Sequence, residues 1–112
     1  MYKGVVQNGN KRASALGFPT LNITLDDPAI TGIFVARVYV AGDVHPAVAF
    51  ADQKRNLLEA HVLDASVDLY GREIEVELLK KIRESAVYDS DEALRAAIEQ
   101  DAAAARAFFR AV

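Results

Sequence analysis

The N-terminal two thirds of the chain consists of short runs rich in β-branched and aromatic residues, separated by turn residues. Residues 73–78 alternate strictly between polar and apolar, which is typical of a strand with one face in solvent. The runs predicted to be strands are residues 2–7, 33–41, 44–51, 57–65 and 73–82. Gly42-Asp43 separates two of them, so these two are expected to form an antiparallel hairpin. Several short antiparallel strands favour a sandwich or a closed barrel.

The last third of the chain has the periodicity of an amphipathic helix. Apolar residues recur at helical spacing from Leu94 to Phe109, so one stripe of the helix is expected to pack on the strands. The alanine run at 102–105 adds high helix propensity. Asp89 is predicted to be the N-cap, with Glu92 three residues later in a capping-box arrangement.

Composition indicates one globular domain over residues 1–112, which is long enough to bury a core. The chain has no cysteine, which excludes disulfides and thiol chemistry. A formal net charge of -3 with scattered basic residues argues against a nucleic-acid-binding surface. Neither an apolar run of transmembrane length nor a signal peptide is found, so we expect a cytoplasmic monomer that does not bind a membrane.

The segment around Gly17-Phe18-Pro19-Thr20 is the first candidate for chemistry. Pro19 fixes its own φ and biases the preceding residue toward extended geometry, so a loop is expected to lead into a strand. Thr20 and Asn22 then point to the same side. Two neutral oxygen ligands suit a hard cation such as Mg²⁺, whose remaining ligands are waters and phosphates. An ordinary turn followed by an asparagine at a strand end is the alternative, and the local sequence by itself favours it.

Glu59 and His61 form the second candidate. They share one face of their predicted strand, while Leu58, Ala60 and Val62 share the other. The apolar set is expected to face the core, so the acid and the imidazole lie where a ligand could cover them. A solvated outer strand face is the alternative for an isolated Glu-x-His. Because the Thr-x-Asn pair is also present, a binding or catalytic site is favoured.

The motifs occur in a defined order along the chain. They are Gly-Phe-Pro-Thr-x-Asn at 17–22, Gly-Ile-Phe at 32–34, Glu-Ala-His-Val-Leu-Asp at 59–64, Asp-Leu-Tyr-Gly at 68–71, Ile-Arg at 82–83 and Tyr-Asp-Ser at 88–90. This ordered set resembles riboflavin kinase (flavokinase), the domain that stands alone in eukaryotes and forms the C-terminal half of bifunctional bacterial FAD synthetases. The similarity runs from about Gly4 to Arg106.

The resemblance implies a mainly β fold, a small closed antiparallel β-barrel of Greek-key type with about six strands and a C-terminal α-helix packed on it. It implies ATP-dependent phosphorylation of the riboflavin 5′-hydroxyl to FMN, with riboflavin/FMN and ATP/ADP as partners. Mg²⁺ is the expected metal, and Zn²⁺ or Mn²⁺ are alternatives. Because the similarity begins near Gly4, we expect a kinase module without an adenylyltransferase half.

The resemblance also assigns roles to residues. Glu59 corresponds to the base that orients or deprotonates the ribityl hydroxyl, and Thr20 and Asn22 correspond to the metal ligands. The residues that correspond to the ATP site are Gly9, Lys11, Arg12, Ser14, Gly17, Pro19 and His61. Those that correspond to the flavin site are Arg83, Tyr88 and Asp89. The chain has no P-loop motif. A solvated turn remains an equal alternative for Lys11 and Arg12, and a purely capping role remains open for Asp89.

Two segments depart from the family pattern. Ala13-Ser14 stand where the family has Gly-Arg, and residues 50–56 replace its Asn-Ile-Gly-x-x-Pro-Thr-Phe block, which contributes to the nucleotide pocket. Lys54 and Arg55 could replace backbone donors with charged contacts to phosphate. The alternatives to a kinase are a catalytically weak or inactive relative that binds a flavin or a nucleotide, and a barrel that serves only as an interaction domain.

Overall fold

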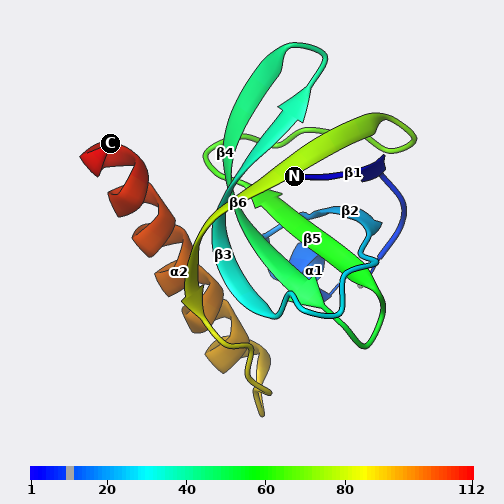
Figure 1. Ribbon diagram of the computed structural model, residues 1–112. Coiled ribbons are helices and arrows are strands. Elements are labelled where there is room, and N and C mark those ends of the chain that lie inside the picture. The colour runs from blue at the N-terminus through cyan, green and yellow to red at the C-terminus, as the bar shows by residue number, and fades with distance from the viewer. Residues whose placement is uncertain (10–11) are drawn as a thin grey trace.

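The computed structural model describes residues 1–9 and 12–112 (Figure 1). Over these residues six strands form one antiparallel sheet in the order β1-β6-β3-β4-β5-β2. The elements are β1 (Tyr2–Val5), α1 (Arg12–Ala15), β2 (Leu21–Thr24), β3 (Gly32–Val40), β4 (Asp43–Asp52), β5 (Leu57–Val62), β6 (Glu73–Arg83) and α2 (Asp91–Ala111). The sheet curls into a nearly closed barrel, because the Gln7 N–H, just beyond β1, donates to the Asn22 carbonyl of β2 at 2.8 Å. The predicted mainly β barrel with a C-terminal helix is confirmed.

The predicted hairpin is formed by β3 and β4, which pair from Gly32↔Ala51 to Val40↔Asp43. The two residues between them, Ala41 and Gly42, both have positive φ, 48° and 88°. A two-residue turn with this geometry matches the right-handed twist of the strands it joins. The Gly-Asp turn signal in the sequence therefore located the hairpin to within one residue.

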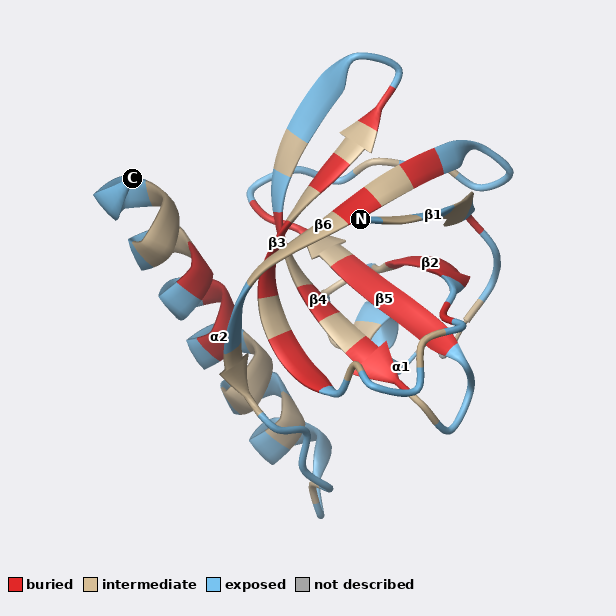
Figure 2. Ribbon diagram, viewed as in Figure 1, coloured by how far each residue is buried: buried red, intermediate tan, exposed pale blue. Residues whose placement is uncertain are grey.

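The interior of the barrel is filled with apolar side chains, many of them alanine and valine. On β5, Leu58 and Ala60 have no exposed surface, and Ala49 and Ala51 of β4 lie opposite them in the register. Figure 2 shows buried segments on β2, β3, β4 and β5. Since successive strand residues alternate between faces, every second residue of β5 faces outward.

Helix α2 packs along the outside of the barrel (Figure 1). Ala102 and Ala105 of its apolar stripe form a buried cluster with Val35 of β3 and Leu63, which follows β5. Their small side chains allow the helix backbone to approach the sheet closely. No helix in the described part of the chain has the length and apolar character needed to cross a membrane.

The predicted start of this helix was wrong by one residue. Ser90, not Asp89, is the N-cap: its backbone is extended, with φ -143° and ψ 158°, and its Oγ accepts a hydrogen bond from the Ala93 N–H at 3.1 Å. Glu92 is therefore the second helical residue and cannot complete a capping box. With Asp91 it places negative charge in the first turn, which favours the helix dipole.

Two other segments differ from the prediction. Residues 12–15, for which no helix or strand was predicted, form the short helix α1, because Ala13 and Ala15 favour helix where glycine would not. The strand predicted at 57–65 ends at Val62, since Asp64 takes a positive φ of 59° and turns the chain. Neither difference changes the order of the strands.

Candidate active site

A row of side chains crosses the outer face of the sheet. Residues paired in register point to the same side of an antiparallel sheet, so a series of partners marks one face. The row runs across β6, β3, β4, β5 and β2 and ends beyond β1, through Arg83, Ile33, Phe50, Glu59, Asn22 and Gln7. It lies outside the barrel because Leu58 and Ala60, the neighbours of Glu59 on β5, face the interior. The two motifs predicted separately therefore meet, with Asn22 directly opposite Glu59.

Glu59 is buried although it lies on this outer face, with 6% of its surface exposed. Its Oε2 has no hydrogen-bond partner among the residues that the structure describes. The pKa of the Glu59 carboxyl is raised from 4.5 to about 7; burial is the largest cause, the charge of Asp52 and a hydrogen bond with it act in the same direction, and the charge of Arg55 opposes the shift. Glu59 is therefore a carboxyl group with one oxygen that can accept a hydrogen bond from a ligand, and with a pKa near neutrality.

Thr20 and Asn22 lie beside it with their side-chain oxygens together. The Thr20 hydroxyl donates to Asn22 Oδ1 at 3.2 Å, and Asn22 Nδ2 donates to the Gln7 carbonyl at 3.5 Å. Gly9 packs against this amide so closely that a Cβ there would lie 2.6 Å from Asn22 Cγ. Only glycine therefore leaves the Asn22 side chain in place.

The two oxygens fit a magnesium ion. Adjacent ligands of an octahedral Mg²⁺ lie about 2.9 Å apart, close to the 3.2 Å between Thr20 Oγ1 and Asn22 Oδ1. No group of three or more His, Asp or Glu side chains suited to a metal occurs within residues 1–9 and 12–112. Any Mg²⁺ here would depend on waters and on the phosphates of a bound ligand for the rest of its shell.

His61 is fixed by the segment that precedes β2. Its Nδ1 lies 2.9 Å from the Pro19 carbonyl oxygen, and its ring packs edge-on against Phe18 at 5.5 Å between centroids. Because a carbonyl can only accept a hydrogen bond, Nδ1 carries the proton and Nε2 is left as an acceptor. His61 thus holds the Gly-Phe-Pro-Thr turn against β5, whatever else it contacts.

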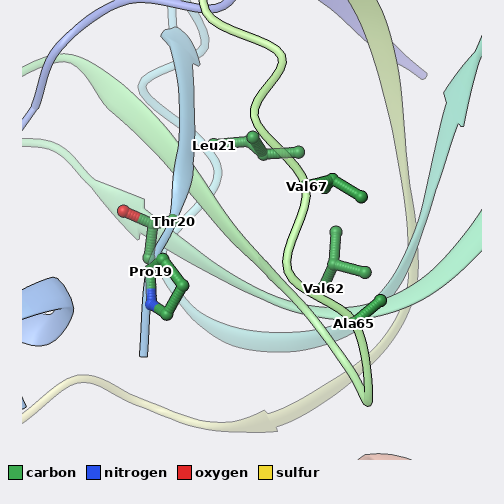
Figure 3. Close-up of a pocket in the computed structure, with 6 residues that line it drawn as sticks. All are labelled: Pro19, Thr20, Leu21, Val62, Ala65 and Val67. Atoms are coloured by element: carbon green, nitrogen blue, oxygen red, sulfur yellow. The ribbon is translucent and has the colours of Figure 1, made fainter. Parts of the chain in front are cut away.

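A cleft of about 380 Å³ opens beside Thr20 and Asn22. Of the residues predicted for the ATP site, Gly9, Ser14 and Pro19 line it as well. The opposite wall is formed by residues 66–70, to which no ligand-binding role was assigned, although Asp68, Leu69 and Tyr70 belong to a motif that carries the family resemblance. A second hollow, of about 20 Å³, lies between Pro19, Thr20 and Val67 (Figure 3) and is too small for more than a water.

Two other residues predicted for the ATP site, Gly17 and Arg12, do not line this cleft. Gly17, with a positive φ of 97°, turns the chain after α1. Arg12 extends away to α2, where its Nε and Nη2 each lie 3.2 Å from Asp91 Oδ1. Lys11 falls outside the described residues.

The predicted flavin residues lie apart from the cleft, at the junction of β6 and α2. Arg83 donates to both carboxylate oxygens of Asp101 at 2.9 and 2.7 Å, and its guanidinium lies 5.9 Å from the Tyr88 ring centroid. Asp89 is exposed, next to the helix cap. The Glu59 row therefore runs between the predicted nucleotide cleft at one end and the predicted flavin residues at the other.

Comparison with known proteins identifies the family of this chain. The model of the riboflavin kinase (flavokinase) family matches residues 1–109. The bifunctional riboflavin kinase/FMN adenylyltransferase of Haemophilus influenzae is 36% identical over 115 residues, covering 95% of this chain and 37% of that protein. The protein of the same name from Pseudomonas fluorescens is 39% identical over 113 residues, covering 93% and 36%.

Among solved structures, one described as a macrolide-efflux protein from Streptococcus pneumoniae superposes with a TM-score of 0.79 and 26% sequence identity, over 93% of this chain and 37% of that one. The chain belongs to the riboflavin kinase family. It spans little more than a third of the bifunctional relatives that it matches.

Proposed function

We propose that residues 1–112 form one domain that transfers the γ-phosphoryl group of ATP to the 5′-hydroxyl of riboflavin, giving FMN and ADP. The observation that supports this most strongly is the unpartnered Glu59 Oε2, buried directly opposite Asn22. A buried carboxylate oxygen without a donor costs stability and marks a place where a ligand hydroxyl fits. Membership of the riboflavin kinase family gives that hydroxyl its identity.

Glu59 is the proposed base. Its free oxygen accepts a hydrogen bond from the ribityl 5′-hydroxyl and takes the proton as the hydroxyl oxygen bonds to the γ-phosphorus. The bond from that phosphorus to the β,γ-bridging oxygen breaks, and ADP leaves with the bond's electron pair. Phosphoryl transfer requires mainly alignment and charge neutralisation, so a single carboxylate suffices on the protein side.

Thr20 and Asn22 are the proposed ligands of Mg²⁺, which neutralises charge on the ATP phosphates when bound. The ATP phosphates are assigned to the cleft between Gly9, Ser14 and residues 66–70. Thr20→Val and Asn22→Ala are expected to weaken Mg·ADP binding at least tenfold, as loss of a metal contact does, and to leave riboflavin binding unchanged. Titration calorimetry measures both, and equal losses for the two ligands would indicate a purely structural role.

The flavin ring is assigned to the region of Arg83, Tyr88 and Asp89, at the opposite end of the row from the cleft. This arrangement puts Glu59 between the two substrates, where the reacting atoms must meet. Arg83 is already held by Asp101, so its part in flavin binding would be through the stacking face of its guanidinium rather than through a new ion pair.

The direct test is to incubate the purified protein with riboflavin, ATP and Mg²⁺ and to separate the flavins by chromatography. We expect FMN to form in proportion to the ADP released. If riboflavin binds in calorimetry but no nucleotide binds, with or without Mg²⁺, the kinase proposal fails and a flavin-binding module replaces it.

A further inference from the structure

The turn between β4 and β5, residues 52–56, is held in place by hydrogen bonds at each end. Asp52 is 4% exposed, and its Oδ1 accepts the backbone N–H groups of Lys54 and Arg55 at 3.1 and 3.2 Å. Gln53 donates to the carbonyls of two residues in the 27–30 turn. The Asn56 carbonyl accepts the Leu25 N–H at 2.8 Å. A turn pinned in this way presents its remaining side chains in defined positions.

The two cations of this turn differ. Arg55 Nη1 lies 3.1 Å from Asp52 Oδ2, so a nearly buried carboxylate anchors its guanidinium. Lys54 is exposed, and its side chain has no ion pair or hydrogen bond within the described part of the chain. The two residues, which the sequence could not distinguish, therefore differ in the structure: Arg55 is anchored and Lys54 is not.

The carboxylate that anchors the Arg55 guanidinium lies diagonally across from Glu59. Asp52 and Glu59 occupy diagonal positions on the same outer face of β4 and β5, because Phe50 is opposite Glu59 and Leu57 is opposite Asp52. The charge of Arg55 lowers the pKa of the Glu59 carboxyl, against the effects of burial and of Asp52. About half of the Arg55 side chain is still exposed, at 53%, so donors not used by Asp52 can reach a ligand.

We propose that Arg55 is a further catalytic residue of this domain, which contacts the phosphoryl group as it passes from ATP to the hydroxyl held by Glu59, and that Asp52 positions it. The inference rests on the proposed kinase function. A phosphoryl group in transfer spreads negative charge over its equatorial oxygens, and a fixed, partly desolvated guanidinium stabilises that charge more than it stabilises bound ATP. If Arg55 served only to neutralise Asp52, it would not need further N–H donors that remain available near Glu59.

The experiment compares Arg55→Ala, Arg55→Lys and the matched control Lys54→Ala in the FMN assay, with the melting temperature of each. Removal of one fixed donor to a developing charge costs about 10²–10³-fold in kcat, so Arg55→Ala is expected to lose about 10²-fold with little change in the KM for riboflavin. Arg55→Lys keeps a cation that can pair with Asp52, and it is expected to keep the melting temperature and lose about tenfold in kcat. Lys54→Ala is expected to match the wild type.

The outcomes are distinguishable from a failure of the kinase proposal. If the wild type makes FMN and the kcat of both Arg55 variants equals that of Lys54→Ala, Arg55 only neutralises Asp52 and the inference is wrong. If Arg55→Ala does not fold, Arg55→Lys becomes the deciding variant. A folded Arg55→Lys protein with unchanged kcat would contradict a contact that depends on the planar guanidinium. If the wild type makes no FMN, the proposed function itself falls, and the inference with it.

Discussion

Two acidic side chains of this protein are buried to the same extent but differ in their hydrogen-bond partners. Glu59 on the outer face of β5 is 6% exposed and Asp101 on α2 is 5% exposed. Asp101 accepts two hydrogen bonds from Arg83, at 2.9 and 2.7 Å, whereas Glu59 Oε2 has no partner among the described residues and lies near a second carboxylate, Asp52. A buried charge with a partner holds elements together; one without a partner costs stability. The difference indicates that the Arg83–Asp101 pair stabilises the packing of α2, and it supports the proposed role of Glu59 in catalysis.

The largest expected effect on stability follows from breaking the satisfied pair. Arg83→Ala leaves Asp101 buried without its partner, and removal of one member of such a pair destabilises a protein by about 3–5 kcal/mol. Urea denaturation measures the free energy of unfolding. A loss below about 1 kcal/mol, as for a surface pair, would show that the contrast between the two acids is false.

Glu59→Gln is expected to increase the free energy of unfolding of the ligand-free protein. Burial raises the pKa of Glu59 from 4.5 to about 7, so the folded state holds its proton more tightly than the unfolded state does. The stability that this proton provides is complete below pH 4.5 and is lost as the pH rises through about 7. At pH 8 the glutamine, which can donate to Asp52, is expected to be the more stable by about 3 kcal/mol. The two proteins are expected to have equal stability at pH 4, and a gain that does not depend on pH would contradict this account.

The smallest effect is expected at an exposed ion pair of α2. Arg106 contacts Asp64 at 2.8 Å and, like Arg83, uses its Nε and Nη2, but the side chains of Arg106 and Asp64 are 40% and 69% exposed. Solvent screening leaves little net stabilisation in such a pair. Arg106→Ala is the matched control for Arg83→Ala, and its denaturation midpoint is expected to equal that of the wild type.

Strand periodicity and turn residues act locally, so they predicted the strands and left a sandwich or a closed barrel open, and the family resemblance favoured the barrel. The β3–β4 hairpin was located from Gly42-Asp43, and the helix from its apolar stripe. The N-cap was misplaced, because Asp89 and Ser90 are both good caps and only the backbone geometry selects Ser90. Periodicity indicated that Glu59 faces outward, but not that this face is covered or that Asn22 is opposite, because register between distant strands is a property of the whole sheet.

The contacts within the candidate site could not be predicted from local sequence patterns either. Gly9 is required by the Asn22 amide that it touches, and residues 66–70 form a wall of the cleft only because β2 lies beside them. The distinction between Arg55 and Lys54 depends on a single contact with Asp52. Contacts of this kind join residues far apart in the chain or choose between neighbours, and no local pattern encodes them.

The free oxygen of Glu59 is proposed to accept a hydrogen bond from the hydroxyl group that is phosphorylated. The most direct test is kcat for FMN formation by Glu59→Gln, measured at saturating riboflavin and Mg·ATP with riboflavin binding determined in parallel. General-base catalysis contributes about 10²–10⁴-fold, so we expect kcat to fall by that factor while riboflavin binds as it does to the wild type. Wild-type turnover in a variant without the carboxylate would contradict the claim.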